Sequence, residues 1–185
     1  TSFSIVLASE PTADVTIAMA STDTTEGTLS TGMVTFTPDD WDSPQLVTVT
    51  GADDDVVDGD IDFEIVIAAA ASADDIYNGL DPDNVLVTNV DDDVAGITVS
   101  SLSGPTTEAG GTATFSIVLD SRPTVAVTIY VGSNDTNEGT VAPQSLVFAP
   151  AAWDTPQVVT VTGADDDVDD GDVSYTVVIG AASTN

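Results

Sequence analysis

Apolar residues alternate with small or polar residues along short blocks of the chain, and turn-forming residues separate the blocks. Alternation with a period of two places the apolar side chains on one face of a strand, so the pattern predicts half-buried β-strands. Thr and Val dominate the blocks, as is typical of strands, and no stretch shows a helical stripe with capping residues. The expected strands include 47–50, 61–67, 85–90, 96–103, 112–119, 125–131, 145–148, 157–162 and 172–179.

The second part of the sequence repeats the first at an offset of 112 residues. Residues 1–73 align with residues 113–185 without a gap, and 40 of the 73 pairs are identical. The segment VTVTGADDDV occurs letter for letter at 47–56 and at 159–168. Seven short strands in about 110 residues are typical of an immunoglobulin-like sandwich. The sequence therefore predicts an all-β protein of two tandem, immunoglobulin-like antiparallel β-sandwiches, at 1–93 and 94–185.

Neither copy of the repeat is complete. The first lacks a counterpart of the opening strand in 96–112, and the second lacks a counterpart of 74–95, which contains the last strand. We therefore expect the sequence to be a window on a longer tandem array, in which neighbouring repeats of the same chain supply the missing strands. In the window itself, each sandwich should expose unpaired backbone at one edge, where an identical chain in a fibre could add a strand instead.

The chain is strongly acidic, since 32 Asp and Glu residues against a single Arg give a formal net charge of −31. It has no His, Cys or Lys, so it offers no ordinary zinc, haem or iron–sulfur site and no Ser–His or Ser–Lys nucleophile. One cation, Arg122, cannot track a phosphate backbone, and the field of the chain repels nucleic acid. No apolar run is long enough to cross a bilayer. We expect neither an enzyme, nor a nucleic-acid-binding protein, nor insertion into a membrane.

The acidic residues gather in loops at strand ends, including the Asp triplets at 53–55, 91–93 and 165–167. Two carboxylates about 4 Å apart repel by about 4 kcal/mol at an effective dielectric constant near 20. Several such pairs rival the stability of a whole domain, about 5–15 kcal/mol. Calcium accepts about six to eight oxygen ligands, which Asp-rich loops provide. The pattern therefore predicts Ca²⁺ binding, with the triplets 53–55 and 91–93 meeting at one end of the first sandwich.

The loops do not follow the EF-hand pattern. Asp165, Asp167 and Asp169 have the spacing of that motif, but Asp170 stands where the loop needs Gly. The alternative interpretation is a set of solvated turns, or the acidic surface of a halophile. The concentration of acids beside strand ends, with few on the strands, favours calcium.

Several short motifs occur in a fixed order along the chain. They are TEAGG at 107–111, FSIVL at 3–7 and 115–119, DTxEGT at 23–28 and 135–140, Phe-x-Pro before each Trp, VTVTGADDDV, and the closing triplet at 91–93. In this order they resemble the Calx-beta repeat family of long bacterial surface proteins. The resemblance implies calcium at one end of each sandwich, held by an early Glu, an Asp in the middle turn, an acidic loop and the closing Asp run.

Transferred to this sequence, the resemblance implies two sets of metal ligands. The first copy's set is Asp23, Asp53, Asp54, Asp55, Asp58, Asp60, Asp91, Asp92 and Asp93. The second copy's set is Glu108, Asp135, Asp165, Asp166, Asp167, Asp170 and Asp172.

We therefore expect a calcium-stabilised structural repeat of a secreted or cell-surface bacterial adhesin, stalk or filament, acting as a spacer or fibre-building module. The competing hypothesis is a repeated module that recognises carbohydrate, such as surface glycans, or another protein. Trp41 and Trp153 follow Phe-x-Pro at turns, where they either stack on a sugar or cover the end of a core. One Trp per copy offers little surface for binding a sugar, so we favour the role of covering the end of the core.

Overall fold

The computed structural model describes residues 1–165, 167 and 171–184, and within these residues it contains strands, turns and loops but no helix. The chain divides into two compact units. Unit 1 consists of Thr1–Asp54 and Asp58–Asp91, and unit 2 of Asp55–Val57 and Asp92–Asn185. No helix among the described residues has the length and apolar character needed to cross a membrane.

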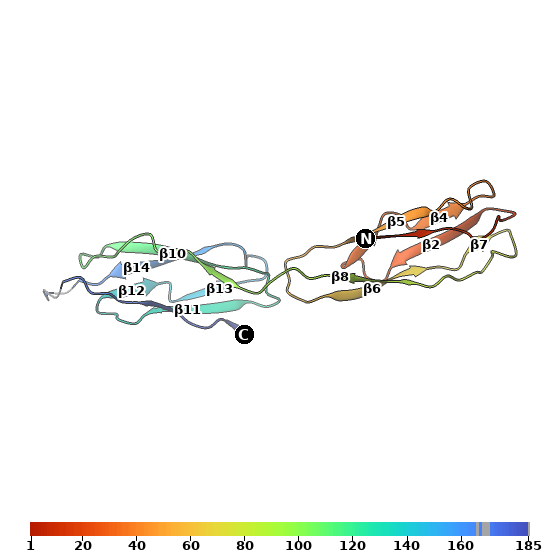
Figure 1. The fold of residues 1–185 in the computed structure, drawn as a ribbon. Coiled ribbons are helices and arrows are strands. Elements are labelled where there is room, and N and C mark those ends of the chain that lie inside the picture. The colour runs from red at the N-terminus through yellow and green to blue at the C-terminus, as the bar shows by residue number, and fades with distance from the viewer. Residues whose placement is uncertain (166, 168–170, 185) are drawn as a thin grey trace. The chain divides into compact units, whose positions relative to one another are not determined.

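Unit 1 is built from two antiparallel sheets (Figure 1). One has the strand order β1–β5–β3, and the other has the order β4–β2–β6–β8, with β7 also pairing with β2. The bounds are β1 (Ser2–Ile5), β2 (Val15–Ser21), β3 (Gly27–Leu29), β4 (Met33–Phe36), β5 (Gln45–Gly51), β6 (Ile61–Ile67), β7 (Ala71–Ser72) and β8 (Val85–Asn89).

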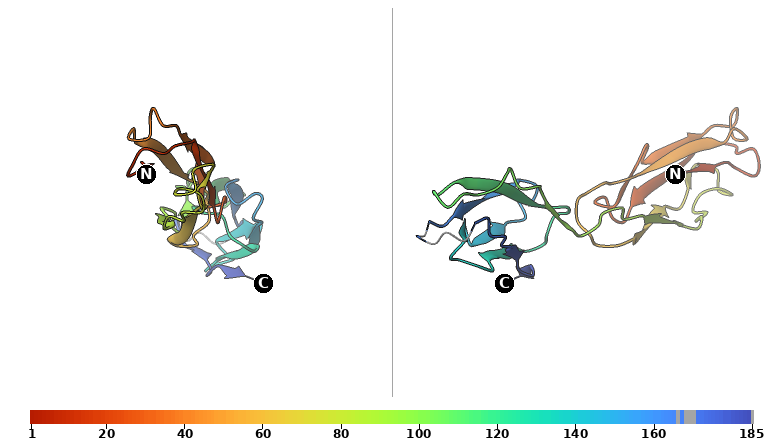
Figure 2. Two further views of the ribbon diagram at one scale, coloured as in Figure 1. Left: turned by 90° about the vertical axis from the view of Figure 1, so that its right-hand side faces the viewer. Right: turned by 60° about the vertical axis from the view of Figure 1, so that its left-hand side comes forward.

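Unit 2 has the same kind of architecture, and Figure 2 shows both units from two further directions. Its sheets have the orders β12–β14–β10–β9 and β13–β11–β15, with β16 also pairing with β11. The bounds are β9 (Ile97–Val99), β10 (Thr112–Leu119), β11 (Val127–Ser133), β12 (Gly139–Ala142), β13 (Ser145–Phe148), β14 (Gln157–Gly163), β15 (Val177–Ile179) and β16 (Ser183–Thr184). The expectation of an all-β, antiparallel sandwich fold is confirmed.

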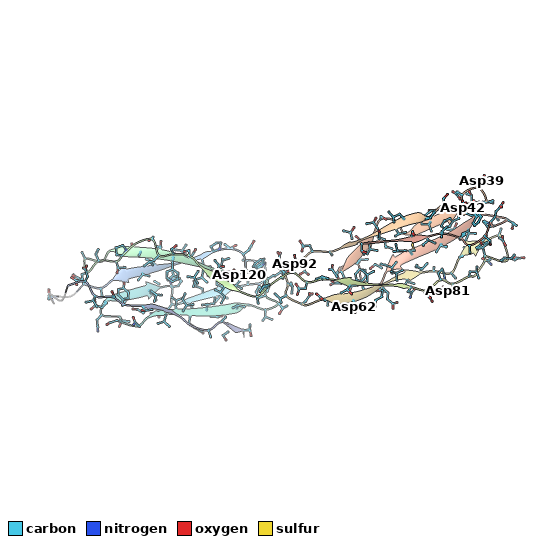
Figure 3. All side chains as sticks on the ribbon, viewed as in Figure 1. Asp39, Asp42, Asp62, Asp81, Asp92 and Asp120 are labelled. Carbon is cyan, nitrogen blue, oxygen red and sulfur yellow. The ribbon has the colours of Figure 1, made fainter. Side chains whose placement is uncertain are left out.

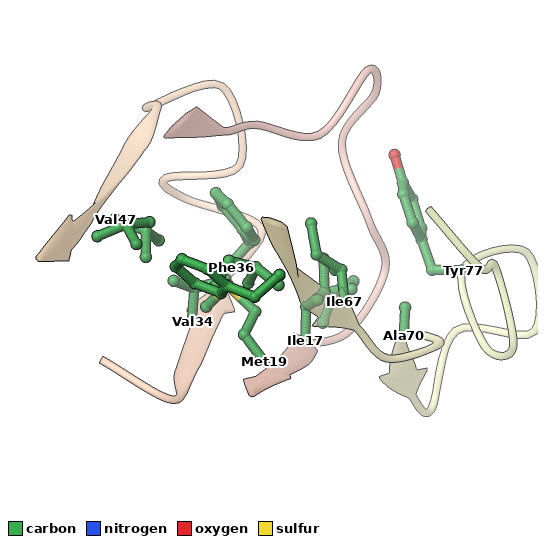
Figure 4. Close-up of a cluster of buried hydrophobic side chains, with 12 residues drawn as sticks. Ile17, Met19, Val34, Phe36, Val47, Ile67, Ala70 and Tyr77 are labelled. Carbon is green, nitrogen blue, oxygen red and sulfur yellow. The ribbon is translucent and has the colours of Figure 1, made fainter. Parts of the chain in front are cut away.

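The core of each unit lies between its two sheets and is formed by alternate strand residues, as a period of two requires. In β2 and β6 every second residue is buried, and Phe36 at the end of β4 is fully enclosed. Figure 4 shows Phe36 at the centre of this cluster and Tyr77 at its edge. In unit 2, Phe148 is enclosed in the same way, and Trp153 packs against the core from a turn.

Several strands begin or end elsewhere than the alternation predicts. The block 96–103 forms only the three residues of β9, and the block 172–179 forms only the three residues of β15. The short strands β3 and β12 were not among those expected. Both pair with a longer neighbour, β5 and β14 respectively, so their extended conformation depends on a tertiary partner rather than on local pattern.

Candidate metal site

Two acidic segments that are about thirty residues apart in the sequence meet in unit 1, and backbone donors connect them. The N–H of Gly59 donates to Oδ2 of Asp91 at 2.7 Å, and the N–H of Asp91 donates to Oδ1 of Asp60 at 3.1 Å. Gly59 has a φ of 81°, which side-chain-bearing residues rarely adopt. The contact follows from the pairing of β6 with β8, in which Ile61 faces Asn89.

Asn89 connects the same end of the unit to the turn before β3. Its Nδ2 donates to the carbonyl oxygen of Ala52 at 2.7 Å and to Oε2 of Glu26 at 3.2 Å. Asn89 also lies against Gly51, because a Cβ at position 51 would come within 2.4 Å of its Oδ1. Sequence reasoning missed both Glu26 and Asn89. The sequence does contain a pattern that points to Glu26, because the same turn recurs 112 residues later with Glu138 in the matching position.

Asp23 lies in the turn between β2 and β3, where its carboxylate closes the turn. The Thr25 hydroxyl donates to Oδ1 at 2.5 Å and the Thr25 N–H donates to it at 2.9 Å. These two hydrogen bonds, the hydroxyl first, lower the pKa of Asp23 below its ordinary value of 3.8. Asp135 occupies the matching turn of unit 2 and accepts a hydrogen bond from the N–H of Asn137 at 3.0 Å.

The remaining candidates of the first copy divide between the two units. Asp53, Asp54 and Asp58 belong to unit 1 and are exposed. The other three, namely Asp55, Asp92 and Asp93, belong to unit 2. The carbonyl oxygen of Asp55 accepts a hydrogen bond from the N–H of Arg122 at 2.6 Å.

In unit 2 several candidates lie around one open groove. Glu108, Asp167 and Asp172 contribute to its lining together with Glu138, which sequence reasoning did not include. Asp165 is exposed in the loop after β14. Asp166 and Asp170 were also expected to bind metal, and both lie outside the described residues.

The side-chain atoms that could coordinate a metal at the acidic end of unit 1 are oxygens, apart from the amide nitrogen of Asn89. The sequence supplies unit 1 with no Lys, Arg or His. The donor chemistry therefore fits a hard divalent cation such as calcium. Among the residues that the structure describes, no three or more Asp, Glu, His or Cys side chains stand close enough together to hold an ion. A metal would thus need the exposed loop carboxylates to close around it.

The opposite end of unit 1 carries acidic residues that lie away from the candidate metal site. The ladders place Val15 beside Phe36 and Ser21 beside Ile65, so the turn after β4 lies away from the acidic loop that precedes β6. Figure 3 shows Asp39 and Asp42 together at this turn. These residues provide natural controls for the acidic loop.

A second polar cluster connects the turn after β7 to the loop between β1 and β2. Asp74, which is only 6 % exposed, accepts hydrogen bonds from the N–H and hydroxyl of Thr12 at 2.8 and 3.0 Å and from the N–H of Ile76 at 2.9 Å. The Thr12 N–H first, and then the Ile76 N–H, lower the pKa of Asp74 below 3.8. Nearby, the Tyr77 hydroxyl bonds to the Ser9 carbonyl oxygen at 2.5 Å and to Ser9 Oγ at 2.7 Å. Both carboxylate oxygens of Asp74 accept hydrogen bonds within the unit, so these contacts hold the turn after β7 to the loop between β1 and β2.

Comparison of the sequence with protein-family models and with curated proteins found no match in either set.

Proposed function

We propose that this protein is a calcium-stabilised structural module of an extracellular bacterial adhesin, stalk or filament, in which the β-sandwiches act as spacer or fibre-building units. The observation that carries the proposal is the meeting of Asp60 and Asp91 in unit 1, on loops that contain no cationic side chain. The resemblance of the sequence motifs to the Calx-beta family supports the same conclusion.

The electrostatics of the acidic end explain why an ion is needed there. Backbone N–H groups donate to the carboxylates of Asp60 and Asp91, and these groups orient the carboxylates but carry no net charge. Asp53, Asp54 and Asp58 add exposed negative charge to the same loop. A divalent cation bound by some of these carboxylates would offset their mutual repulsion and hold the loop before β6 against the end of β8.

The ligands proposed for unit 1 are Asp60 and Asp91, assisted by Asp58, the Glu26 side chain and the backbone carbonyl groups of the loop. When bound, calcium would supply positive charge and oxygen coordination and would perform no catalytic step. Asn89 positions this end of the unit, because it already connects Ala52 and Glu26 to β8. In unit 2, the corresponding turn and groove carboxylates are Asp135, Glu138, Asp167 and Asp172.

A calcium-dependent module suits an extracellular environment. Extracellular sites of this kind bind calcium with dissociation constants of about 10⁻⁴–10⁻³ M, so millimolar calcium would fill them. Binding to the folded state alone raises its stability by mass action. We therefore place the protein outside the cell, secreted or at the cell surface.

The test is a calorimetric melt of the full chain in millimolar calcium and in chelator. We expect calcium to raise the melting temperature, because it binds the folded acidic loops and not the unfolded chain. The double substitution Asp60→Asn and Asp91→Asn should remove most of the response of unit 1. Asn keeps the size and one acceptor oxygen, so the backbone contacts to Gly59 and Asp91 are preserved while the charge is lost.

The matched control is the double substitution Asp39→Asn and Asp42→Asn, which removes the same charge at the opposite end of the same unit. It should leave the calcium response unchanged. A melting temperature that does not respond to calcium in the unsubstituted chain would contradict the proposal. Equal effects of the two double substitutions would show that calcium acts through general screening and not through a site.

The carbohydrate hypothesis makes a different prediction for the tryptophans. Trp153 packs against the core of unit 2, and its carbonyl oxygen accepts a hydrogen bond from the N–H of Leu119 at 3.4 Å. This supports a role in covering the end of the core. Glycan-array binding that is lost on Trp41→Ala, with folding unchanged, would favour recognition over a structural role.

A further inference from the structure

The turn between β11 and β12 carries a short motif that the proposed function does not use. Asn134, Asp135 and Thr136 form the tripeptide Asn-x-Thr, with a residue other than Pro in the middle. This tripeptide is the acceptor motif for N-linked glycosylation, which attaches a bulky, hydrophilic sugar to the surface of a secreted protein. Because so short a motif also occurs by chance, the surroundings of Asn134 decide its meaning.

Only the oxygen of the Asn134 side-chain amide is used within the fold. The N–H of Asn134 donates to the carbonyl oxygen of Thr176 at 3.0 Å, and the N–H of Thr176 donates to Oδ1 of Asn134 at 2.6 Å. Because an N–H group needs an acceptor, this second bond identifies which amide atom is the oxygen. Asn134 is exposed, and no group among the described residues hydrogen-bonds to its Nδ2. The nitrogen to which a sugar is attached is therefore free.

The contact between Asn134 and Thr176 does not require an asparagine. The matching residue of unit 1 is Thr22, which is also exposed. The N–H of Thr22 donates to the carbonyl oxygen of Glu64 at 2.9 Å, and the N–H of Glu64 donates to Oγ1 of Thr22 at 2.9 Å. A hydroxyl oxygen thus fills the same role, so the amide nitrogen of Asn134 is not needed for this contact.

The turn itself is held by other groups. Oγ of Ser133 donates to the carbonyl oxygen of Asp135 at 2.8 Å, and the N–H of Asn137 donates to Oδ1 of Asp135 at 3.0 Å. Unit 1 closes the matching turn with the same two bonds. Thr136 is exposed, and its hydroxyl makes no hydrogen bond to the described part of the chain. Both side chains of the motif that a transferase would recognise are therefore available in the folded turn.

The other asparagines of the described chain do not share these features. None of the residues Asn78, Asn84, Asn89 and Asn137 is followed two positions later by Ser or Thr. Asn84 and Asn89 also use their amide nitrogens, which donate to Glu64 and to Ala52 and Glu26 respectively. Within the described residues, only Asn134 combines the motif, exposure and an unpaired amide nitrogen.

We propose that Asn134 is a modification site that carries an N-linked glycan. In the reaction, Nδ2 of Asn134 forms a bond to the anomeric carbon of a sugar, while the bond from that carbon to a phosphate leaving group breaks. The phosphate leaves with the electron pair of that bond, and Nδ2 loses one proton. The product keeps Oδ1, so the hydrogen bond from the N–H of Thr176 is retained after modification.

The inference rests on the proposed placement of the protein outside the cell, because the motif is used in secreted chains. The glycan lies on the turn that also contains Asp135, just before β12. A bulky, hydrophilic and uncharged group there makes the surface more soluble without adding to its negative charge. It gives unit 2 a surface feature that unit 1, with Thr22 at the matching position, lacks.

The test is peptide mapping by mass spectrometry of the full chain, secreted by the cells that produce it. The chain has no Lys and its one Arg precedes Pro, so a protease that cleaves after Glu replaces trypsin. Cleavage after Glu108 and Glu138 releases residues 109–138, which contain Asn134. We expect this peptide to be heavier by whole sugar residues, and to carry an aspartate at position 134 after enzymatic removal of the glycan. An unmodified Asn134 would overturn the proposal.

Two substitutions exchange the turns of the two units. Asn134→Thr copies the residue of unit 1 and keeps a side-chain oxygen for the N–H of Thr176, so it should abolish the glycan and leave unit 2 folded. Thr22→Asn creates the same motif in unit 1, because Thr24 follows two residues later. It should add a sugar to residues 11–26, which the same protease releases. Failure of Thr22→Asn to gain a sugar would overturn the assignment of this turn as the recognised element.

Thr136 provides the matched control. Thr136→Ser keeps the hydroxyl and should keep the glycan, whereas Thr136→Ala should lose it. A sugar that remains after Thr136→Ala would overturn the proposal, because the modification would then not depend on the motif. Absence of sugar from Asn134 in a chain whose melting temperature still rises with calcium would overturn this inference alone and leave the proposed function intact.

Discussion

Gly27 lies directly against the ring of Phe63, so that a Cβ at position 27 would come within 2.3 Å of the ring atom Cζ. Gly139 stands in the same relation to Tyr175, because a Cβ at position 139 would come within 2.3 Å of the ring atom Cζ and of the hydroxyl oxygen. In both units a glycine at the start of a short strand makes room for an aromatic side chain from the opposite sheet. The two rings differ in their surroundings, because Phe63 is buried beside β8, whereas Tyr175 lines an open groove and its hydroxyl shares a hydrogen bond with Thr106 Oγ1 at 2.7 Å.

This difference predicts unequal costs for the same substitution. Gly27→Ala should lower the free energy of unfolding of unit 1 by about 1–3 kcal/mol, because Phe63 is buried and cannot move away. Gly139→Ala should cost unit 2 less, since Tyr175 borders the groove and can move at the loss of its hydrogen bond to Thr106. The measurement is denaturant unfolding of both variants. Gly132→Ala is the control, because nothing lies within 4 Å of a Cβ there. Equal losses for Gly27→Ala and Gly139→Ala would contradict the interpretation.

Tyr77→Phe should destabilise unit 1 by about 1 kcal/mol, through the loss of the hydroxyl that bonds to Ser9. Tyr130→Phe serves as the control, because Tyr130 is 59 % exposed and removing its hydroxyl should change stability by less than about 0.5 kcal/mol. Thermal melts of the two variants in the same buffer make the comparison. If both variants melt as the unsubstituted chain does, the Tyr77 contact contributes nothing.

Asp74 should make the stability of unit 1 depend on pH. Its hydrogen bonds from Thr12 and Ile76 favour the ionised carboxylate and lower its pKa below 3.8. The stabilisation is therefore fully present above pH 3.8, the ordinary value, and is lost as the pH falls through the lowered pKa of the folded state. Asp74→Asn should be less stable than the unsubstituted chain at pH 7, and the gap should narrow in acid.

Urea unfolding at pH 7 and well below pH 3.8 measures that gap. Asp75→Asn provides the control, since Asp75 is the adjacent, exposed residue and carries the same charge. Comparison with it separates the local effect of Asp74 from the general loss of negative charge in acid. A gap between Asp74→Asn and the unsubstituted chain that stays constant with pH would rule out the assigned hydrogen bonds as its cause.

Magnesium should replace calcium poorly. It requires near-octahedral geometry with short oxygen distances and gives up its water reluctantly, whereas the acidic loops offer scattered carboxylates and carbonyl groups. At equal millimolar concentration, magnesium should therefore raise the melting temperature by less than calcium does. Equal effects of the two ions would indicate screening of the acidic loops without a defined site.

The candidate site shows where sequence reasoning stops. The Asp-rich loops and their position at strand ends are evident from residue types alone, as is the absence of compensating cations. The alternation of apolar residues also indicates which faces of β2 and β6 are buried. Side-chain direction in a strand is a local property with a period of two, so it can be deduced from neighbouring residues.

Which acids come together could not be deduced in this way. Asp91 meets Asp60 because β8 pairs with β6 in one register, whereas Asp92 and Asp93 belong to the other unit. Asn89 acquires its role from the same ladder. Strand pairing joins residues that are distant in the sequence, and its hydrogen bonds are made by backbone groups that every residue shares. The sequence by itself therefore determined the strand pattern, the buried faces and the acidic loops, and only the tertiary structure decided which strand ends lie together.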